Sequence, residues 1–495
     1  MTTDATGKPV PAHHLTYPQK FRATGAILGS AIGDALGAPF EFERGGLYSS
    51  QFPRPVLSGT GEMIGGGGFG WAPGEFTDDT QMAMALAESL IAHGGLDLDD
   101  LWERFQAWRL SAADVGIVTS IVLSRPERHG AAEHGHHATG GRSASNGCVM
   151  RIAPVGVLGV RLGSDATAAL AAGQARLTHH DPAAAVGAAL VAELIRHIIV
   201  TGEFRGVAEA ILDDFAATGT FAADVVGEYR RYVAEGFDPL SPAIPGNGSV
   251  WTTVGQALWA VRSTDSFESA MRAVIDLGGD TDTVAAVAGA IAGALYGAQR
   301  IPIRWTTYVH GYLRMPDGSQ REYRMQDLID VSRLLLGEEK SRMSYRDAPV
   351  GPRLVHEAGV HAANLDGAAT APRDHGVVSL CMTEERFLNH VNRRQVYIRD
   401  KENPQNDDLF FVVRDAVEAI DAFLAEGRDV VVHCHGGRSR TGLVLKAWYM
   451  AREGATHAEA HNWLRGEWEH YETWTQSFWD FLDNEWTAHV GQKGA

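Results

Sequence analysis

Small residues dominate a helical pattern from Phe21 to about Tyr312, and this pattern limits the possible fold more than any other feature of the chain. Ala-rich segments alternate there with Gly-rich loops, and strand-like alternation is scarce. Because alanine and glycine let helices approach closely, the pattern predicts an all-α domain with its functional groups in loops at helix ends. The clearest helical segments are Gln81–Ala92, Pro182–Val200, Val254–Val261 and Thr283–Ala298.

The rest of the chain has a different character. A charged, Arg-rich stretch contains one amphipathic segment, Met325–Leu336, which we expect to be a linker helix. Two β-branched runs, Gly376–Leu380 and Val430–Val432, follow, and an amphipathic segment, Leu409–Glu426, precedes the second run. This alternation predicts a small α/β domain with a parallel sheet. The expected boundaries are a flexible tail at 1–20, a first domain at 21–312, a linker at 313–352 and a second domain at 353–490.

Composition agrees with a multidomain globular protein, since 495 residues exceed one ordinary core and 45% of them are hydrophobic. The formal net charge of -18 disfavours general nucleic-acid binding, so a nucleic acid is expected only as a modified substrate. Residues 1–20 lack the apolar core of a signal peptide, and the most apolar stretch, Thr283–Gly297, is short for a membrane span. With only three cysteines (Cys148, Cys381 and Cys434), we expect a cytoplasmic protein without a membrane partner.

Two similar Asp/Thr clusters, Thr77–Thr80 and Gly279–Thr283, each stand immediately before an Ala-rich helical segment. Asp and Thr are also good helix N-caps, so two unrelated caps are the alternative interpretation. Hard divalent cations such as Mg²⁺ prefer oxygen ligands of this kind. If the clusters meet in space, they can hold two such ions.

A longer set of motifs carries a family resemblance. The segment Gly29–Glu41, GSAIGDALGAPFE, resembles the opening helix and loop of ADP-ribosylglycohydrolases, including the dinitrogenase reductase-activating type. The two Asp/Thr clusters match the metal motifs of that family, and three further segments match in family order: Ser145–Gly147, Met150–Pro154 and Leu177–His179. The resemblance covers roughly Phe21 to Trp305 and implies an all-α ADP-ribosylglycohydrolase-like domain.

The resemblance implies a binuclear Mg²⁺ centre, supported by Asp34, with Mn²⁺ as the alternative metal. The implied reaction is hydrolysis of the N- or O-glycosidic bond of ADP-ribose attached to a protein or a small molecule. Two ions can coordinate the ribose hydroxyls, polarise a water molecule and stabilise charge in the transition state. The implied ligands are Thr77, Asp78, Asp79, Asp280, Asp282 and Thr283.

Other roles also follow from the resemblance. Glu41 matches the family's catalytic loop carboxylate near the ribose. Asp114 resembles the catalytic-site acid that faces the leaving guanidinium, although its flanking residues differ and a solvated or capping Asp is the alternative. The implied substrate-binding residues are Ser145, Asn146, Gly147, His179 and Gly279; a structural role is the alternative for His179, and the backbone amides of the Ser145–Gly147 turn suit a diphosphate.

Four histidines lie close together in a Gly/Ala-rich stretch. We expect a mobile, solvated loop there, bordering the adenosine pocket, and not a metal site. They are His129, His134, His136 and His137.

A second chemical motif, HCHGGRSRTG, follows the apolar run Val430–Val432 and precedes an apolar helical segment. A strand, a Gly-bearing loop and a helix N-terminus form an anion cradle, which here begins at Cys434. Arg440, six residues later, can bind two phosphate oxygens at once. The motif resembles the Cys-x5-Arg signature of tyrosine and dual-specificity phosphatases.

This resemblance implies that Cys434 attacks phosphorus, Arg440 holds the phosphoryl oxygens, Thr441 helps the thiolate leave and Gly437 belongs to the substrate-binding loop. The expected general acid is Asp400, with Asp407 and Asp408 as alternates. A phosphorylated protein, nucleotide or ADP-ribose metabolite is the expected substrate.

The two resemblances together favour a bifunctional hydrolase. One alternative is an ADP-ribose sensor that targets or regulates a phosphatase. The other is a phosphate-recognition module attached to a glycohydrolase.

Overall fold

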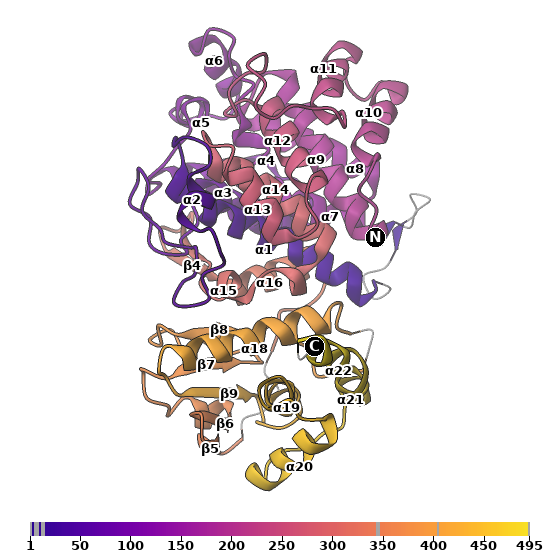
Figure 1. Cartoon of the computed structure of the whole chain (residues 1–495). Helices are drawn as coiled ribbons and strands as arrows, with labels where there is room; N and C mark the ends of the chain where they lie inside the picture. The colour runs from indigo at the N-terminus through magenta and orange to yellow at the C-terminus, as the bar shows by residue number, and fades with distance from the viewer. Residues whose placement is uncertain (1, 4–8, 11–14, 343–346, 403–404, 494–495) are drawn as a thin grey trace. The chain divides into compact units, whose positions relative to one another are not determined.

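Figure 1 shows the protein, for which we used a computed structural model that describes residues 2–3, 9–10, 15–342, 347–402 and 405–493. The chain divides into two compact units. Unit 1 comprises residues 1–54, 63–301 and 308–340, and unit 2 comprises residues 55–62, 302–307 and 341–495. The expected tail at 1–20 lies partly outside the described residues, and its last residues, from Tyr17, begin the first helix.

Unit 1 is helical, as predicted, with two small β-hairpins. Its helices are α1 Tyr17–Gly37, α2 Leu47–Gln51, α3 Asp78–His93, α4 Leu98–Arg109, α5 Ile117–Leu123, α6 Ala131–Ala138, α7 Ala153–Leu162, α8 Ser164–Thr178, α9 Pro182–Thr201, α10 Val207–Thr218, α11 Ala223–Val233, α12 Val250–Arg262, α13 Phe267–Ile275, α14 Thr281–Tyr296 and α16 Met325–Leu335. Short 3-10 turns span Ala38–Phe40, Asn146–Cys148 and Ala298–Arg300. The hairpin strands are β1 Thr2–Thr3, β2 Pro9–Val10, β3 His310–Arg314 and β4 Gln320–Arg324.

Glycines fix the packing of α1 against α14. A methyl group on Gly29 would lie 2.2 Å from the carbonyl oxygen of Gly289, and one on Gly33 would lie 2.0 Å from that of Ala285. No side chain fits at these positions, so the two backbones are in direct contact. This close approach brings the C-terminal end of α1 to the N-terminal end of α14, where the second Asp/Thr cluster lies.

One helix in the described part of the chain, α9, is long and apolar enough to cross a membrane. However, 89% of its most apolar window is buried inside the protein. The helix packs against α7, α8 and α14, which is the environment of a core helix.

Two local elements differ from the expectation. The stretch expected as a mobile loop is partly helical, because Ala131 and Gly135 of α6 pack inward and a methyl group on Gly135 would lie 2.5 Å from Val122 Cγ2. The segment expected as a linker helix forms α16 within unit 1, where Ser332 Oγ lies 2.9 Å from Thr24 Oγ1 of α1.

Unit 2 is a small α/β fold around a five-stranded sheet of order β5-β6-β9-β7-β8, in which only the β5–β6 pair is antiparallel. The predicted parallel sheet is thus confirmed. Its elements are α15 Ile303–Thr306, β5 Arg353–His356, β6 Val360–Asn364, α17 Leu365–Ala368, β7 Gly376–Ser379, β8 Arg393–Gln395, α18 Leu409–Ala425, β9 Val430–Cys434, α19 Ser439–Glu453, α20 His457–Glu467, α21 Gln476–Phe481, a π-helical turn Leu482–Trp486 and α22 Thr487–Lys493. Alternate residues of β9 face two apolar clusters, of which the larger includes α18 and α19.

Two short segments from the earlier part of the chain complete unit 2. The buried carboxylate of Glu62 accepts hydrogen bonds from Arg304 Nε at 2.9 Å and from Trp305 Nε1 at 2.7 Å. The backbone N–H of Ile303 donates to Asp415 Oδ2 at 2.7 Å. Buried ion pairs and hydrogen bonds of this kind are costly to break, so these segments are integral to unit 2.

Candidate active sites

The end of α1 and the starts of α3 and α14 meet around Asp34 and the two Asp/Thr clusters. The buried carboxylate of Asp34 accepts hydrogen bonds from the backbone N–H groups of Thr77 at 2.9 Å and Thr80 at 3.0 Å, and from Thr80 Oγ1 at 2.5 Å. Asp34 therefore fixes the N-terminus of α3 beside α14.

Carboxylate oxygens crowd at this junction. One oxygen from each of Asp34, Asp79 and Asp282 lies within 4.8 Å of the others, and so does one from each of Glu41, Asp114 and Asp282. Thr77 Oγ1 and Thr283 Oγ1 lie 3.3 and 3.4 Å from Asp79 Oδ2. The structure thus brings both predicted clusters together.

The acidic cluster lacks a positive partner among the described residues. Asp79 Oδ1 and Glu41 Oε2 are buried and make no hydrogen bond there. Burial, followed by the charges of Asp114, Asp280 and Asp34, raises the pKa of Glu41 to about 8. Burial also raises the pKa values of Asp79 and Asp282 well above the ordinary range. An oxygen-only, buried and charge-crowded set of ligands fits hard divalent cations.

A cavity of about 550 Å³ opens over the cluster. Most of the sequence-predicted residues of the first site line this cavity. They are Glu41, Asp78, Asp114, Ser145, Asn146, Gly147, Asp280, Asp282 and Thr283.

Asn146 does not act as a free amide donor at this wall. Its backbone N–H donates to the carbonyl of Gly248 at 3.2 Å, and its Nδ2 donates to Asp280 Oδ2 at 2.8 Å. The predicted diphosphate cradle therefore loses one amide, and the Asn146 side chain positions a carboxylate instead.

His179 and Gly279 support the cavity without lining it. His179 is fully buried, with Nε2 2.7 Å from Ser145 Oγ, and burial together with the charge of Arg151 lowers its pKa to about 3. Gly279 has φ 76°, and its backbone exchanges hydrogen bonds with Phe42 and Glu43 on the loop of Glu41. Both residues position groups of the cavity wall.

Asn247 and Phe42 are among the residues near the site that the motifs did not predict. Asn247 Oδ1 accepts the backbone N–H of Asp280 at 3.1 Å, and its Nδ2 donates to the carbonyl of Gly278 at 2.9 Å. The Gly-Asn-Gly turn at 246–248 was the available signal. Phe42, 73% exposed with φ 61°, stands at the cavity mouth and had no such signal.

The second site lies at the carboxyl end of β9. Cys434 is the last residue of this strand, is 2% exposed and precedes the loop that leads into α19. Gly437 adopts φ 67°, and a methyl group there would lie 2.7 Å from the carbonyl oxygen of Ala363. The buried side chain of Trp468 fixes the loop, because its Nε1 donates a hydrogen bond to the Gly437 carbonyl at 2.7 Å.

Arg440 and Asp400 face each other beside this loop. Arg440 Nε lies 3.7 Å from Asp400 Oδ2, and Arg440 Nη1 donates to the carbonyl of Leu380 at 2.7 Å. Thr475 Oγ1 donates to Asp400 Oδ1 at 3.0 Å. Asp408, one of the alternates for the general acid, instead caps α18 by accepting the N–H of Phe411 at 2.8 Å.

The remaining polar groups of the loop are buried. Thr441 is fully buried, and its Oγ1 has no hydrogen-bond partner in the described residues. His433 Nε2 lies 2.7 Å from Ser379 Oγ, and burial lowers the pKa of His433 to about 3. A neutral His433 therefore links β9 to β7 through Ser379, next to Cys434.

Comparison with known proteins identifies two domains in the chain. The family model for ADP-ribosylglycohydrolase matches residues 16–341, and the model for the dual specificity phosphatase catalytic domain matches residues 376–482. The chain belongs to the ADP-ribosylglycohydrolase family and also carries a dual specificity phosphatase domain. Both resemblances stated from the sequence are confirmed.

Individual relatives match the first of these regions. The ADP-ribosylarginine hydrolase Tri1 of Serratia proteamaculans (strain 568) is 33% identical over 294 residues, which cover 57% of this chain and 74% of the relative. The ADP-ribosyl-[dinitrogen reductase] glycohydrolase of Rhodospirillum rubrum is 32% identical over 285 residues, covering 57% and 88%. The solved structure of an ADP-ribosylglycohydrolase-related protein complex is 31% identical and covers 65% of this chain and 98% of its own, with a TM-score of 0.48.

Proposed function

We propose that the chain is a bifunctional hydrolase that cleaves the glycosidic bond of ADP-ribosylated substrates in unit 1 and phosphomonoesters in unit 2. The observation that carries the first activity is the set of buried, unpartnered carboxylate oxygens under an open cavity, with Glu41 and Asp114 on its wall. A cytoplasmic location is part of the proposal, supported by three unpaired cysteines.

In unit 1, the proposed ligands of two Mg²⁺ ions are Thr77, Asp78, Asp79, Asp280, Asp282 and Thr283, with Mn²⁺ as the alternative metal. Asp34, which shares the carboxylate cluster, supports this centre. Bound divalent cations supply positive charge that can hold ribose hydroxyls and polarise water.

The chain's own groups then have separate tasks. Glu41 faces the cavity, where its carboxylate orients the attacking water and stabilises positive charge at the anomeric carbon. Asp114 holds the leaving group, which accords with hydrolases named for ADP-ribosylarginine among the relatives. Ser145 and Gly147 bound the space for the diphosphate.

In unit 2, the Cys434 thiolate attacks phosphorus and forms a phosphocysteine while the substrate oxygen leaves with a proton from Asp400. Arg440 holds the phosphoryl oxygens. Water then hydrolyses the phosphocysteine, and Thr441 stabilises the departing thiolate. The Arg440–Asp400 contact supports this assignment, because both groups border one anion-binding loop.

The glycohydrolase is tested by release of free ADP-ribose from arginine- and serine-linked ADP-ribosyl proteins, with Mg²⁺ or with a chelator. We expect Mg²⁺-dependent release by the wild type and a loss on the order of 10³-fold in Asp282→Ala, because an anchor of the ion site is removed. Calorimetry should show weaker Mg²⁺ binding by the same variant.

Two outcomes would contradict this assignment. Release that persists in the chelator would exclude a divalent-cation mechanism. Binding of ADP-ribose without any release would instead favour the sensor alternative, in which unit 1 recognises ADP-ribose and regulates unit 2.

A further inference from the structure

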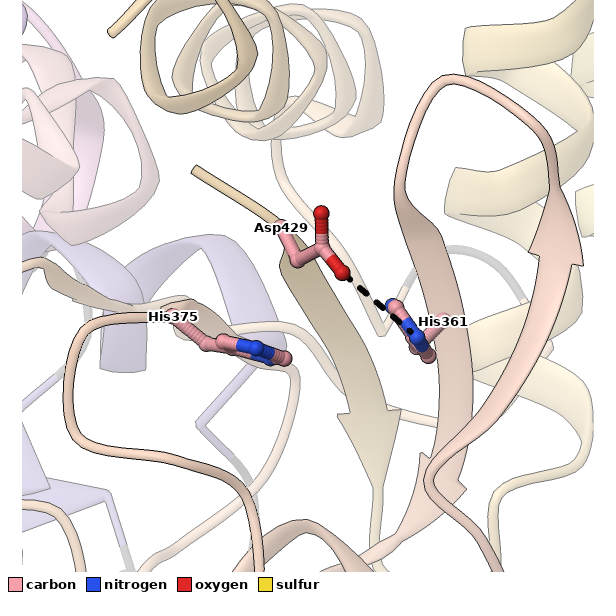
Figure 2. A group of neighbouring side chains, drawn as sticks. All are labelled: His361, His375 and Asp429. Atoms are coloured by element: carbon pink, nitrogen blue, oxygen red, sulfur yellow. Dashed lines mark ion pairs between the residues drawn. The ribbon is translucent and has the colours of Figure 1, made fainter. Parts of the chain in front are cut away.

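Three side chains that can bind metal gather at the amino ends of the central strands of unit 2 (Figure 2). His361 is the second residue of β6, His375 immediately precedes β7, and Asp429 immediately precedes β9. These strands are parallel neighbours, since Val430 of β9 is in register with the first residues of both β6 and β7. Side chains from three distant parts of the sequence therefore meet at one edge.

The spacing of their ligand atoms suits a shared ion. His361 Nε2 lies 3.8 Å from Asp429 Oδ2, the rings of His361 and His375 have centroids 5.6 Å apart, and ligand atoms of all three residues lie within 4.8 Å of one another. Tetrahedral zinc with bonds of about 2.0–2.1 Å places its ligand atoms about 3.3 Å apart. The half-exposed side chain of Asp429 can rotate to bring its carboxylate to this distance.

The hydrogen bonding of His361 leaves its Nε2 atom available to bind a metal ion. Its Nδ1 lies 3.2 Å from the carbonyl oxygen of Gly359, and because a carbonyl can only accept, Nδ1 carries the proton. In the neutral ring Nε2 then carries the lone pair, and the dashed line in Figure 2 marks the contact of His361 with Asp429. Histidine ligands of metals are commonly oriented by such a bond from the second ring nitrogen to a carbonyl.

The surrounding backbone holds the other two residues in place. Gly359 has φ 94°, a conformation that favours glycine, and a methyl group there would lie 2.5 Å from Asp429 Oδ1 in its present position. The carbonyl of Asp429 accepts the N–H of Gly376 at 2.8 Å, which fixes the chain beside His375. His375 Nδ1 is buried without a hydrogen-bond partner among the described residues, and its ring is directed toward the other two side chains in Figure 2.

We propose that His361, His375 and Asp429 form a binding site for a divalent transition-metal ion of the zinc class. Two imidazoles and one carboxylate favour Zn²⁺, Co²⁺ or Ni²⁺ over Mg²⁺, which prefers oxygen-only ligands such as those of unit 1. Three protein ligands leave a fourth position for water. Since Cys434 is five residues after Asp429 along β9, at about 3.3 Å per residue, the ion lies on the order of 16 Å from the thiol and joins three strands without entering the phosphatase chemistry.

Co²⁺ titration of the full chain tests the proposal, because four-coordinate Co²⁺ absorbs strongly in the visible range. The titration is made with Mg²⁺ in excess, which occupies oxygen-ligand sites, and in the Cys434→Ser background, which removes the Cys434 thiolate as a competing ligand. We expect one equivalent of Co²⁺ with this absorption, displaced by Zn²⁺. In His375→Gln and Asp429→Asn the dissociation constant should rise on the order of 100-fold.

A matched control is His137→Gln, since His137 is 3.8 Å from Glu133 in an exposed pair that lacks a third ligand among the described residues. Its Co²⁺ binding should equal that of the parent chain. Circular dichroism of each variant separates loss of binding from loss of folding, and two independent variants guard against failure of one. Equal Co²⁺ binding by His375→Gln, Asp429→Asn and the parent chain, or absence of binding by the parent, would overturn the proposal.

Discussion

Arg440 combines a structural contact with a proposed chemical role at the loop that follows Cys434. Its Nη1 is fixed by the carbonyl of Leu380, while its Nε faces Asp400. A planar guanidinium can hold two phosphoryl oxygens and keep such a contact, whereas a lysine offers a single ammonium point charge. Conservation of charge at this position is therefore insufficient for the proposed reaction.

We accordingly predict that Arg440→Lys lowers kcat/KM for a phosphomonoester by about 10²-fold or more, which corresponds to at least about 3 kcal/mol of transition-state stabilisation. Arg438→Lys is the matched control, because Arg438 is exposed and pairs with Glu472 at 3.1 Å. Steady-state kinetics of both variants with the same phosphomonoester measure the two losses in kcat/KM. A similar loss in Arg438→Lys would show that general positive charge, and not the guanidinium of Arg440, is what matters.

At the scale of elements, the α1–α14 contact links packing to the first site. Gly29 contributes no side chain, yet it sets the separation of two helices whose ends carry Asp34 and Asp282. The glycine-rich pattern could be recognised from the sequence, and so could the all-α character. The pairing of α1 with α14 could not, because it depends on which two helices meet across more than two hundred intervening residues.

Gly29→Ala should destabilise unit 1 by about 2 kcal/mol or more, since the added methyl group would lie 2.2 Å from the Gly289 carbonyl oxygen and 2.9 Å from Phe267 Cε2. Gly227→Ala in α11 is the control: nothing lies within 4 Å of its added methyl group, so the better helix propensity of alanine should stabilise by about 0.5–1 kcal/mol. Chemical denaturation measures both. Destabilisation of equal size in the two variants would refute the steric explanation.

At the scale of the whole chain, the sequence motifs predicted the two chemistries, whereas the division of the chain into two units was harder to predict. Local sequence around Asp78, Asp282 and Cys434 indicated two chemistries, since each motif is contiguous and precedes or follows a regular element. Segments 55–62 and 302–307 carry no comparable signal for their place in unit 2, because Glu62 and Arg304 pair only after folding. The cluster of His361, His375 and Asp429 likewise depends on strand register, which separated residues do not reveal.

Unit 2 also contains a buried lysine that makes its stability depend on pH. Lys446 is 2% exposed, and its Nζ lies 2.8 Å from Nε2 of His457, whose Nδ1 is 2.8 Å from Asp483. Burial lowers the pKa of Lys446 from its ordinary 10.5 to about 7, with the charge of Asp483 opposing part of this effect. Between these values the folded chain keeps a neutral amine while the unfolded chain binds a proton.

Since the unfolded state binds more protons in this window, the free energy of unfolding of unit 2 should rise as pH increases from about 7 toward 10.5, and fall again as pH decreases. Lys446→Met removes the titrating group and should flatten this dependence while filling a similar volume between Tyr471 and Trp479. Calorimetric scans of the full chain from pH 7 to about pH 9 can follow the transition that shifts with pH, and the same slope in Lys446→Met would assign the dependence to another group.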